Sequence, residues 1–408
     1  MDSVIEGENG HDFVIVGGGI GGLATALALH RKGFKDVVVY ERSKRLRAEG
    51  PGLVIFSNGW RALDQLGVGD QLREKAILLQ GAEDVYVDQG KSQNLSSFDR
   101  SGEARCLKRS DLINVLANAL PRGTIRFGCN AIAVKTNSQN MSPILQLGDD
   151  KAIPAKILIG CDGSNSKVAD FLGLKLISSF KTFGAVRGLT KYPNKHLLPP
   201  TFVHMRRDKN LVGRIPINDK LVFWYVELSP PGGQFPNDPE LIRKATLGMV
   251  KGFPFEVVEM IEKSDLASLS FTDIRYRHPW EIVAGNFRRG SVTVLGDAMH
   301  AMPPFRGQGA SAALEDAVVL ARNLGQRICS LDQFEGRRNI IDCQKIRAAL
   351  DGYVKERRMR ILHLSLQTYL IGVILDKPSL IVKFIAIMIL VIVFRDETRH
   401  VKYDCGKL

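Results

Sequence analysis

The residues with the clearest chemical meaning are Gly17, Gly19 and Gly22, which directly follow the apolar run Phe13–Val16. Glycines at this spacing allow a tight turn, a close approach of the backbone to a pyrophosphate and a helix packed against the strand. The free amides at the start of that helix would stabilise phosphate charge. Glu41 follows the next strand-like run and could accept hydrogen bonds from ribose hydroxyls. The complete pattern predicts a dinucleotide site, and its position near the N-terminus favours FAD over NAD.

Two further segments place ligand-binding side chains at the start of a helix or the end of a strand. Arg109 begins a helix-like stretch, where it could contact a phosphate or the ribityl chain, or lie in solvent. Asp162 and Gly163 follow the apolar strand Ile157–Gly160. Because ligands bind at the carboxyl ends of strands in open α/β sheets, this pair could form a second phosphate contact. It could also simply cap the next helix.

A third segment combines an acid with a stiff, glycine-rich loop. Asp297 follows the strand-like run Val292–Leu295 and could bind sugar-alcohol hydroxyls of a cofactor. Pro303 and its proline neighbour fix the backbone of the loop. Gly307 and Gly309 then open a helix of small residues, whose free amides would stabilise the electron-rich edge of a ring.

Other polar residues in this region have simpler interpretations. His300 is expected to make a structural hydrogen bond and not to act in catalysis. Glu315 and Asp316 are expected to complement the dipole of the helix that carries them. The densest basic run, Arg337 to Arg360, is expected to form the solvated face of a helix.

The middle of the chain has a different composition. Residues 183–229 and 266–277 are rich in β-branched and aromatic residues, which predicts a separate, mostly antiparallel sheet. Residues 238–263 are expected to form a helix between its strands. A sheet laid against a dinucleotide domain creates an apolar pocket at the interface, where small ligands usually bind. The candidate pocket residues, each of which could equally be ordinary sheet surface, are Arg187, Arg214, Trp224 and Tyr276.

Composition limits the classes of function. The chain has 408 residues and a net charge of +13, which suits an anionic ligand, an acidic membrane surface or nucleic acid. No aromatic residues are interleaved with the basic ones, so nucleic acid is not expected as a partner. The 6 cysteines are widely spaced and lack metal-binding spacing, which predicts a reduced, intracellular protein without a metal site. The short polar N-terminus has no signal peptide, so we expect a cytoplasmic protein that is not secreted.

The last part of the chain contains a strongly apolar segment, Leu380 to Phe394, interrupted only by Lys383. As a helix it would be roughly 22 Å long, shorter than the ~30 Å hydrocarbon core of a bilayer. Three interpretations stay open: a helix packed on the protein body, an interfacial or re-entrant membrane anchor, and a single membrane span. Residues 380–394 are therefore a candidate for peripheral membrane association, and the oligomeric state is left open.

Several motifs occur in order along the chain: GGGIGG (17–22) with Glu41-Arg42, RSDL (109–112), CDGSNSKV (161–168), GDAMHAMPPFRGQG (296–309) and LEDA (314–317). In this combination they resemble the class A flavoprotein monooxygenases over roughly residues 12–325. The plan is similar to para-hydroxybenzoate hydroxylase and salicylate hydroxylase, and the fuller similarity is to plant proteins related to zeaxanthin epoxidase. The resemblance implies an α/β fold with a Rossmann-like FAD-binding domain of the para-hydroxybenzoate hydroxylase type. A second, mostly antiparallel β-sheet substrate domain and a C-terminal helical segment would complete it.

The resemblance also implies a cofactor and a reaction. FAD would be held by Gly17, Gly19, Gly22, Glu41, Arg42, Arg109 and Asp297. Asp162 and Gly163 would serve both FAD and transiently bound NAD(P)H, and the loop from Pro303 through Gly307 to Gly309 would lie along the isoalloxazine ring. NAD(P)H, as co-substrate, would reduce the flavin, and O2 would then give a flavin hydroperoxide that hydroxylates or epoxidises a small aromatic or isoprenoid substrate. No side-chain nucleophile is expected, because the chemistry belongs to the cofactor.

The sequence departs from the family pattern in several places. Ala169 stands where an Arg is usual, which leaves the docking of NAD(P)H open, and Ser311 replaces a frequent Asn. A plastid-targeting leader and the extra C-terminal module of the plant epoxidase are not found, so zeaxanthin epoxidation is not expected. No second GxGxxG unit occurs, which suits a single-FAD design without a standing NAD(P)H site.

We expect a discontinuous FAD-binding domain from residues 12–80, 101–175 and 285–325. Residues 81–100 and 176–284 would form the substrate domain, and residues 326–408 a helical C-terminal region. Two other functions stay open. One is a flavin-dependent reductase or dehydrogenase acting on an isoprenoid, and the other is a non-catalytic FAD-fold protein docked on a membrane.

Overall fold

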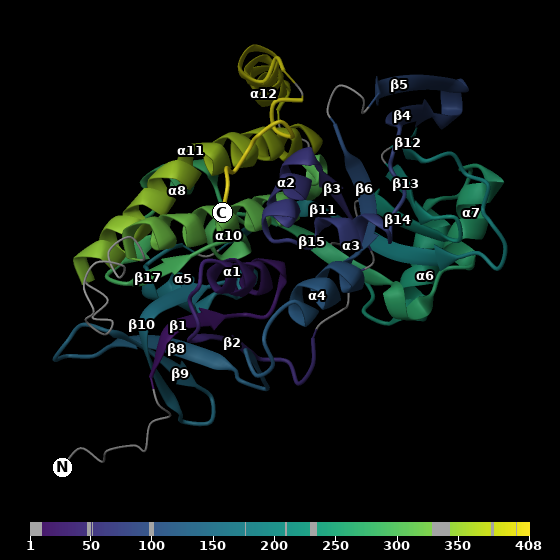
Figure 1. The fold of residues 1–408 in the computed structure, drawn as a ribbon. Helices are drawn as coiled ribbons and strands as arrows, with labels where there is room; N and C mark the ends of the chain where they lie inside the picture. Colours follow the sequence, from purple (N-terminus) through teal and green to yellow (C-terminus); the bar gives the residue numbers. More distant parts are fainter. Residues whose placement is uncertain are drawn as a thin grey trace.

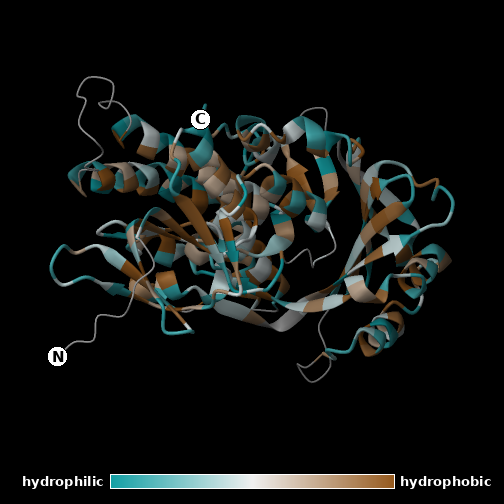
Figure 2. Ribbon diagram, turned by 60° about the horizontal axis from the view of Figure 1, so that its bottom comes forward, coloured by the Kyte–Doolittle hydropathy of each residue, from teal (hydrophilic) through white to brown (hydrophobic). Residues whose placement is uncertain are grey.

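The computed structural model describes residues 10–46, 50, 52–97, 102–175, 177–208, 210–228, 235–328, 343–376, 379–396 and 398–408. Cys329 and the first part of the basic run, residues 337–342, lie outside the described residues. Figure 1 shows two sheets beside each other, with long helices stacked over the first and shorter helices on the outer side of the second. In Figure 2, apolar residues are concentrated in the strands and in the helices between the layers, and many of the peripheral loops are hydrophilic.

The first sheet has a parallel centre. Its strands are β1 (His11–Val16), β2 (Val37–Glu41), β7 (Ile125–Phe127), β8 (Ala131–Thr136), β9 (Pro143–Leu147), β10 (Ala152–Gly160), β16 (Arg288–Arg289) and β17 (Val292–Val294). The order β17-β10-β1-β2-β7 is parallel throughout, and β16 and the β8–β9 hairpin add antiparallel pairs. β2 is buried along its whole length, as expected for a central strand covered on both faces. Between β1 and β2 the chain forms α1 (Ile20–Arg31), so the predicted strand, glycine turn, helix and strand are present.

The second sheet is antiparallel except for one pair. It contains β4 (Gly81–Tyr86), β5 (Lys91–Ser97), β11 (Ser178–Lys191), β12 (Thr201–Arg207), β13 (Asn210–Asn218), β14 (Leu221–Leu228) and β15 (Ser270–Tyr276). The order is β15-β11-β14-β13-β12-β4-β5, with β12 and β4 parallel. Alternate residues of a strand point to opposite faces of the sheet. Val222, Trp224 and Val226 therefore pack in one cluster on the outer face, and Phe223 packs in another cluster on the opposite, inner face.

The outer face of the second sheet is covered by two helices. The single helix predicted over residues 238–263 is instead two helices, α6 (Pro239–Met249) and α7 (Phe255–Glu262). The break follows from Gly252, which has a φ of +84°, and from Pro254, which precedes α7. Val257 and Ile242 of these helices pack with Trp224. The outer face is therefore a core, and only the inner face can border a ligand.

Shorter elements connect the two sheets. They are β3 (Gly52–Phe56), β6 (Ala104–Lys108), α2 (Ser57–Gln65), α3 (Gly69–Arg73), α4 (Arg109–Asn118), α5 (Lys167–Phe171), α8 (Pro279–Ala284) and α9 (Asp297–His300). β3 and β6 pair with each other. Val54 and Cys106 on this pair are buried with Ile215 and Phe223 of the second sheet. The pair therefore packs on the inner face of the second sheet.

Three helices complete the fold: α10 (Gly309–Ile328), α11 (Cys343–Leu375) and α12 (Leu380–Val393). α10 lies between α1 and α11 and is buried over most of its length. The prediction of a solvated basic face is wrong for Arg357 of α11, whose side chain is completely buried. In contrast, α12 has only Ala386 buried. None of the described helices combines the length and apolar character needed to cross a membrane.

Candidate functional site

A cavity of about 340 Å³ opens where β1, β10 and β17 end. Parallel strands bring their carboxyl ends to one edge of a sheet, so segments distant in sequence meet there. Of the residues predicted from the sequence, the cavity is lined by Gly17, Gly19, Glu41, Arg109, Asp162, Gly163, Asp297 and Gly309. The predicted residues that do not line it are Gly22, Arg42, Pro303 and Gly307.

The glycine turn after β1 has little space for side chains. Gly17 has a φ of +104°, and a Cβ there would lie 2.5 Å from the carbonyl oxygen of Cys161. A Cβ on Gly22 would lie 1.9 Å from the carbonyl oxygen of Gly17, so Gly22 acts by allowing close packing of α1. Gly19 differs, because a Cβ there would meet no atom within 4 Å. Gly19 therefore faces open space, as a residue beside a phosphate must.

Glu41 is buried at the end of β2, beside the glycine turn. The N–H groups of Gly18 and Ser43 donate to its two carboxylate oxygens at 2.7 and 2.8 Å. These bonds hold the carboxylate at the cavity wall, and a carboxylate has enough lone pairs to accept further bonds from ribose hydroxyls. The neighbouring Arg42 is exposed and lies outside the cavity wall.

Asp162 both lines the cavity and caps a helix. Its carboxylate accepts hydrogen bonds from the Ser166 hydroxyl at 2.5 Å and from the Lys167 N–H at 2.7 Å. Ser166 in turn accepts from the N–H of Ala169 and caps α5. Burial raises the pKa of Asp162. The two interpretations proposed from the sequence, a capped turn and a ligand contact, are therefore compatible.

The third segment supplies an acid and a helix start. Asp297 is exposed at the cavity, and the structure gives its carboxylate no hydrogen-bonding partner among the described residues. α10 begins at Gly309, and both Gly309 and Ala310 line the cavity at the helix N-terminus. Pro303 and Gly307 lie in the loop that precedes this helix. Their contact with an isoalloxazine ring stays a prediction.

A buried ionic cluster lies behind this third segment, and the sequence did not predict it. Arg357 donates from Nε to Asp316 at 2.6 Å and from Nη2 to Glu315 at 2.7 Å, and all three side chains are fully buried. His300 Nε2 lies 2.6 Å from the second oxygen of Asp316, which also accepts from the Gly296 N–H at 3.0 Å. Burial alone would raise the pKa of Asp316, but the charges of His300 and Arg357 lower it to about 2.

The same cluster extends to the loop before α10. Asn58 of α2 donates from Nδ2 to Glu315 at 2.6 Å and to Gln308 at 2.8 Å. Gln308 immediately precedes Gly309 at the cavity, and Gly296 immediately precedes Asp297. Glu315 and Asp316 thus do more than complement a helix dipole, because they hold both cavity-lining turns. His300 has the structural role that the sequence suggested.

The pocket candidates on the second sheet separate into two faces. Arg214 pairs with Trp224 in the sheet register, and Trp224 is fully buried in the cluster formed with α6 and α7. Both side chains therefore point away from the cofactor cavity, which corrects the prediction for these two residues. Tyr276 packs against Phe180 and Tyr369 near α11, with ring centroids 4.4 and 5.3 Å apart.

Arg187 is the candidate that lies on the inner face. It pairs with Tyr225 in the register, and Glu227 is two residues further along β14 on the same face. Burial lowers the pKa of Arg187, with Glu227 and Tyr225 opposing this shift and Arg109 adding to it. The charge of Arg109, a residue of the cavity wall, therefore acts on Arg187.

Tyr225 and Glu227 were not predicted from the sequence. Burial raises the pKa of Glu227 to about 7, although Arg206 and Arg187 act against the shift. The Tyr225 hydroxyl lies 2.8 Å from Nε2 of His204. The alternation of side chains along β14 could have identified both residues, because a Trp224 assigned to the core on one face places Tyr225 and Glu227 on the opposite face.

The cavity residues fit an FAD molecule. Open space beside Gly19, the amides at the starts of α1 and α10, and the carboxylates of Glu41 and Asp297 match a pyrophosphate flanked by a ribose and a ribityl chain. Among the described residues, no group of His, Cys, Asp and Glu side chains could hold a metal ion.

Comparison with known proteins agrees with an FAD site in this cavity. Residues 11–332 match the model of a family described as an FAD binding domain. The chain is 46% identical to Monooxygenase 1 of Arabidopsis thaliana over 97% of this chain and 98% of that protein. It is 33% identical to Monooxygenase 2 of Arabidopsis thaliana over 91% of each chain.

Solved structures share the fold. HpxO of Klebsiella pneumoniae, crystallised with FAD and uric acid, superposes with a TM-score of 0.78 over 97% of both chains, at 20% sequence identity. A 2-methyl-3-hydroxypyridine-5-carboxylic acid oxygenase superposes with a TM-score of 0.69 over 97% of this chain and 98% of the other, at 23% identity. At these identities the likeness concerns the fold, and it confirms the architecture expected from the motifs.

Proposed function

The chain belongs to the FAD-binding-domain family and is an FAD-dependent monooxygenase, and from this premise we propose that it uses NAD(P)H and O2 to hydroxylate or epoxidise a small substrate. The observation that carries the proposal is the meeting of the GGGIGG, CDG and GD segments at one cavity. The β3–β6 pair, which leads into Arg109 of the cavity wall, packs on the inner face of the second sheet. Bound FAD would supply the redox chemistry, accepting electrons from NAD(P)H and activating O2.

The chain's own residues would bind and orient the cofactor. The amides around Gly19 would hold the pyrophosphate, Glu41 the adenosine ribose and Asp297 the ribityl chain. The N-terminus of α10 at Gly309 would place its amide dipoles against the pyrimidine edge of the ring and stabilise negative charge there. Asp162 and Gly163 complete the wall on the side of β10.

The inner face of the second sheet would bind the substrate. Phe202, which is partly exposed in the cluster of this face, provides apolar surface, and Arg187, Tyr225 and Glu227 provide polar groups on the same face. A mixed lining with a guanidinium and a phenol suits an aromatic substrate that carries an acidic or hydroxyl group. This chemistry favours an aromatic acid or phenol over an isoprenoid.

The decisive experiment is a panel of aromatic acids, phenols and isoprenoids tested with purified holoenzyme. We expect an aromatic member to stimulate oxygen-dependent NAD(P)H oxidation and to yield a product heavier by one oxygen atom. Reduction of the flavin by a substrate under argon, without NAD(P)H, would instead support a dehydrogenase. Stimulation by isoprenoids alone would overturn the proposed substrate class.

A pair of variants tests the substrate face without touching the cofactor contacts. Arg187→Met should raise the KM for the responding aromatic substrate by at least about tenfold and leave bound flavin unchanged. Arg214→Met is the matched control, because Arg214 lies on the opposite face of the same sheet. Equal effects of the two substitutions on KM would contradict the assignment of the inner face.

A further inference from the structure

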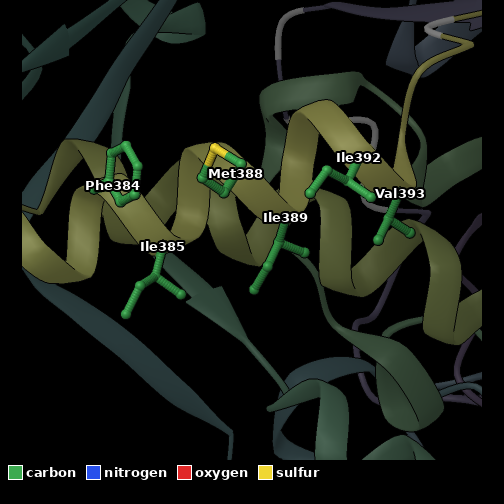
Figure 3. Close-up of a pocket in the computed structure, with 6 residues that line it drawn as sticks. All are labelled: Phe384, Ile385, Met388, Ile389, Ile392 and Val393. Carbon is green, nitrogen blue, oxygen red and sulfur yellow. The ribbon is translucent and has the colours of Figure 1, made fainter.

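The outermost helix of the molecule, α12, exposes a large apolar surface. Figure 3 shows the side chains of Phe384, Ile385, Met388, Ile389, Ile392 and Val393 projecting from this one helix. Leu380 is 85% exposed, Ile381 73%, Phe384 65%, Val391 60% and Ile392 54%. Scattered exposed hydrophobic residues need no explanation, but a continuous apolar surface of this kind marks an interaction site.

Only one strip of α12 is packed on the protein. Ala386 is buried with Leu370 of α11, and Ile389 and Leu390 pack against the same small cluster. Phe394, directly after the helix, is also buried there, and its ring is tilted against that of His363, with ring centroids 4.6 Å apart. The helix is therefore held firmly along one side and presents its other sides outward.

The shape of this surface favours a fluid partner over a folded one. Figure 1 shows α12 beyond α11, at the edge of the molecule. The hollow on it is lined by α12 side chains alone, so among the described residues no second element contributes to this hollow as the wall of a protein-binding groove would. Acyl chains can surround a convex apolar cylinder without such a groove.

Charge and length point to an anionic bilayer surface. Lys383 lies within the helix, and the exposed Arg395 and Arg399 follow it. Lys402 also follows the helix but lies 3.8 Å from the carboxylate of Asp396. The whole chain has a net charge of +13. Basic residues beside an apolar helix are attracted to anionic headgroups. A helix of 14 residues is about 21 Å long, which is too short to cross the ~30 Å hydrocarbon core but suits a position in the plane of the interface.

We propose that α12 is a membrane-docking element that inserts its outward apolar sides into an anionic lipid surface and lies parallel to it. The flanking basic side chains would contact the lipid headgroups. This surface is separate from the cofactor cavity, so docking does not depend on the catalytic assignment.

The test is flotation of the full-length holoenzyme with vesicles of phosphatidylcholine alone or mixed with phosphatidylglycerol. We expect most of the protein to float with the mixed vesicles, less with the neutral ones, and binding to weaken in high salt. The double substitution Ile385→Glu/Ile392→Glu should reduce flotation at least about tenfold. Val283→Glu on α8 is the matched control, because Val283 is a 55% exposed aliphatic residue outside α12.

Bound flavin and the unfolding temperature show whether each variant is folded. If the double Glu variant does not fold, the less disruptive variant Ile385→Ser/Ile392→Ser replaces it. Equal flotation of the wild type and the α12 variant would overturn the proposal. A second result would also overturn it: the wild type is a dimer, the α12 substitutions convert it to a monomer, and neither protein floats with vesicles. The apolar surface of α12 would then bind a second copy of the chain and not a membrane. Equal binding to neutral and anionic vesicles would overturn the electrostatic part.

Discussion

Replacing Arg357 with Met should be among the most damaging single changes in this protein outside the cavity. The guanidinium is fully buried between Glu315 and Asp316, at 2.7 and 2.6 Å. Met has a similar length but no charge, so it leaves two buried carboxylates with fewer partners. Breaking a buried ion pair by removing one partner costs about 3–5 kcal/mol, and we expect the free energy of unfolding to fall by about this amount.

The substitution should also weaken flavin binding, because Asp316 and Glu315 hold the turns that precede Asp297 and Gly309. Urea unfolding followed by circular dichroism measures stability, and flavin absorbance after gel filtration measures retention. The control is Arg358→Met, which removes a partly buried guanidinium whose hydrogen-bond partners among the described residues are backbone carbonyl groups, including that of Ile282. This change should cost about 1–2 kcal/mol.

The triple variant Arg357→Met/Glu315→Gln/Asp316→Asn provides a further check. It removes the charge of Arg357 together with the two carboxylates that Arg357 bonds, and the Gln side chain that replaces Glu315 can still accept from Arg360, which lies 3.0 Å from Glu315. Removing paired buried charges together is much less costly than removing one partner. We therefore expect the triple variant to be more stable than Arg357→Met alone. A loss of less than about 1 kcal/mol in the single variant, or a triple variant less stable than the single one, would refute this reasoning.

Three further predictions concern the cavity and pH. Gly19→Val should abolish copurified flavin, measured by absorbance at the flavin band. The control is Gly248→Val on α6, which should retain flavin; the surroundings of Gly248 are as open as those of Gly19. The pKa of Asp316 is lowered from 3.8 to about 2, so the contribution of this carboxylate to stability is present above pH 4 and is lost as pH falls toward 2. Urea titrations at several pH values should show this loss in the wild type and not in Asp316→Asn. Because the pKa of Glu227 is raised from 4.5 to about 7, the folded protein holds a proton that the unfolded chain releases, so this group lowers stability as pH rises from about 4.5 to 7. Glu227→Gln should remove that slope, and an unchanged slope would contradict the raised pKa of Glu227.

The sequence alone was enough for the family, the cofactor and the Rossmann-like unit, and the physical reason is locality. The glycine turn, the helix start and the acid after the next strand lie within about 30 residues, so their spacing reports backbone geometry directly. Asp162 and Asp297 could be recognised as strand-end acids for the same reason, and the strands that carry them indeed end at one cavity.

Only the tertiary structure decided which long-range partners those local signals have. A basic run with helical spacing predicts a solvated face, yet α11 turns Arg357 inward onto Glu315 and Asp316 of α10. Which face of β14 is covered by helices could not be predicted from the sequence either: α6 and α7 cover the side of Trp224, and Arg187 and Tyr225 lie on the other side. The same holds for α12, whose apolar sequence suits a core, an interface or a lipid surface equally. Burial depends on which elements meet, and that is a property of the packed chain and not of any short segment.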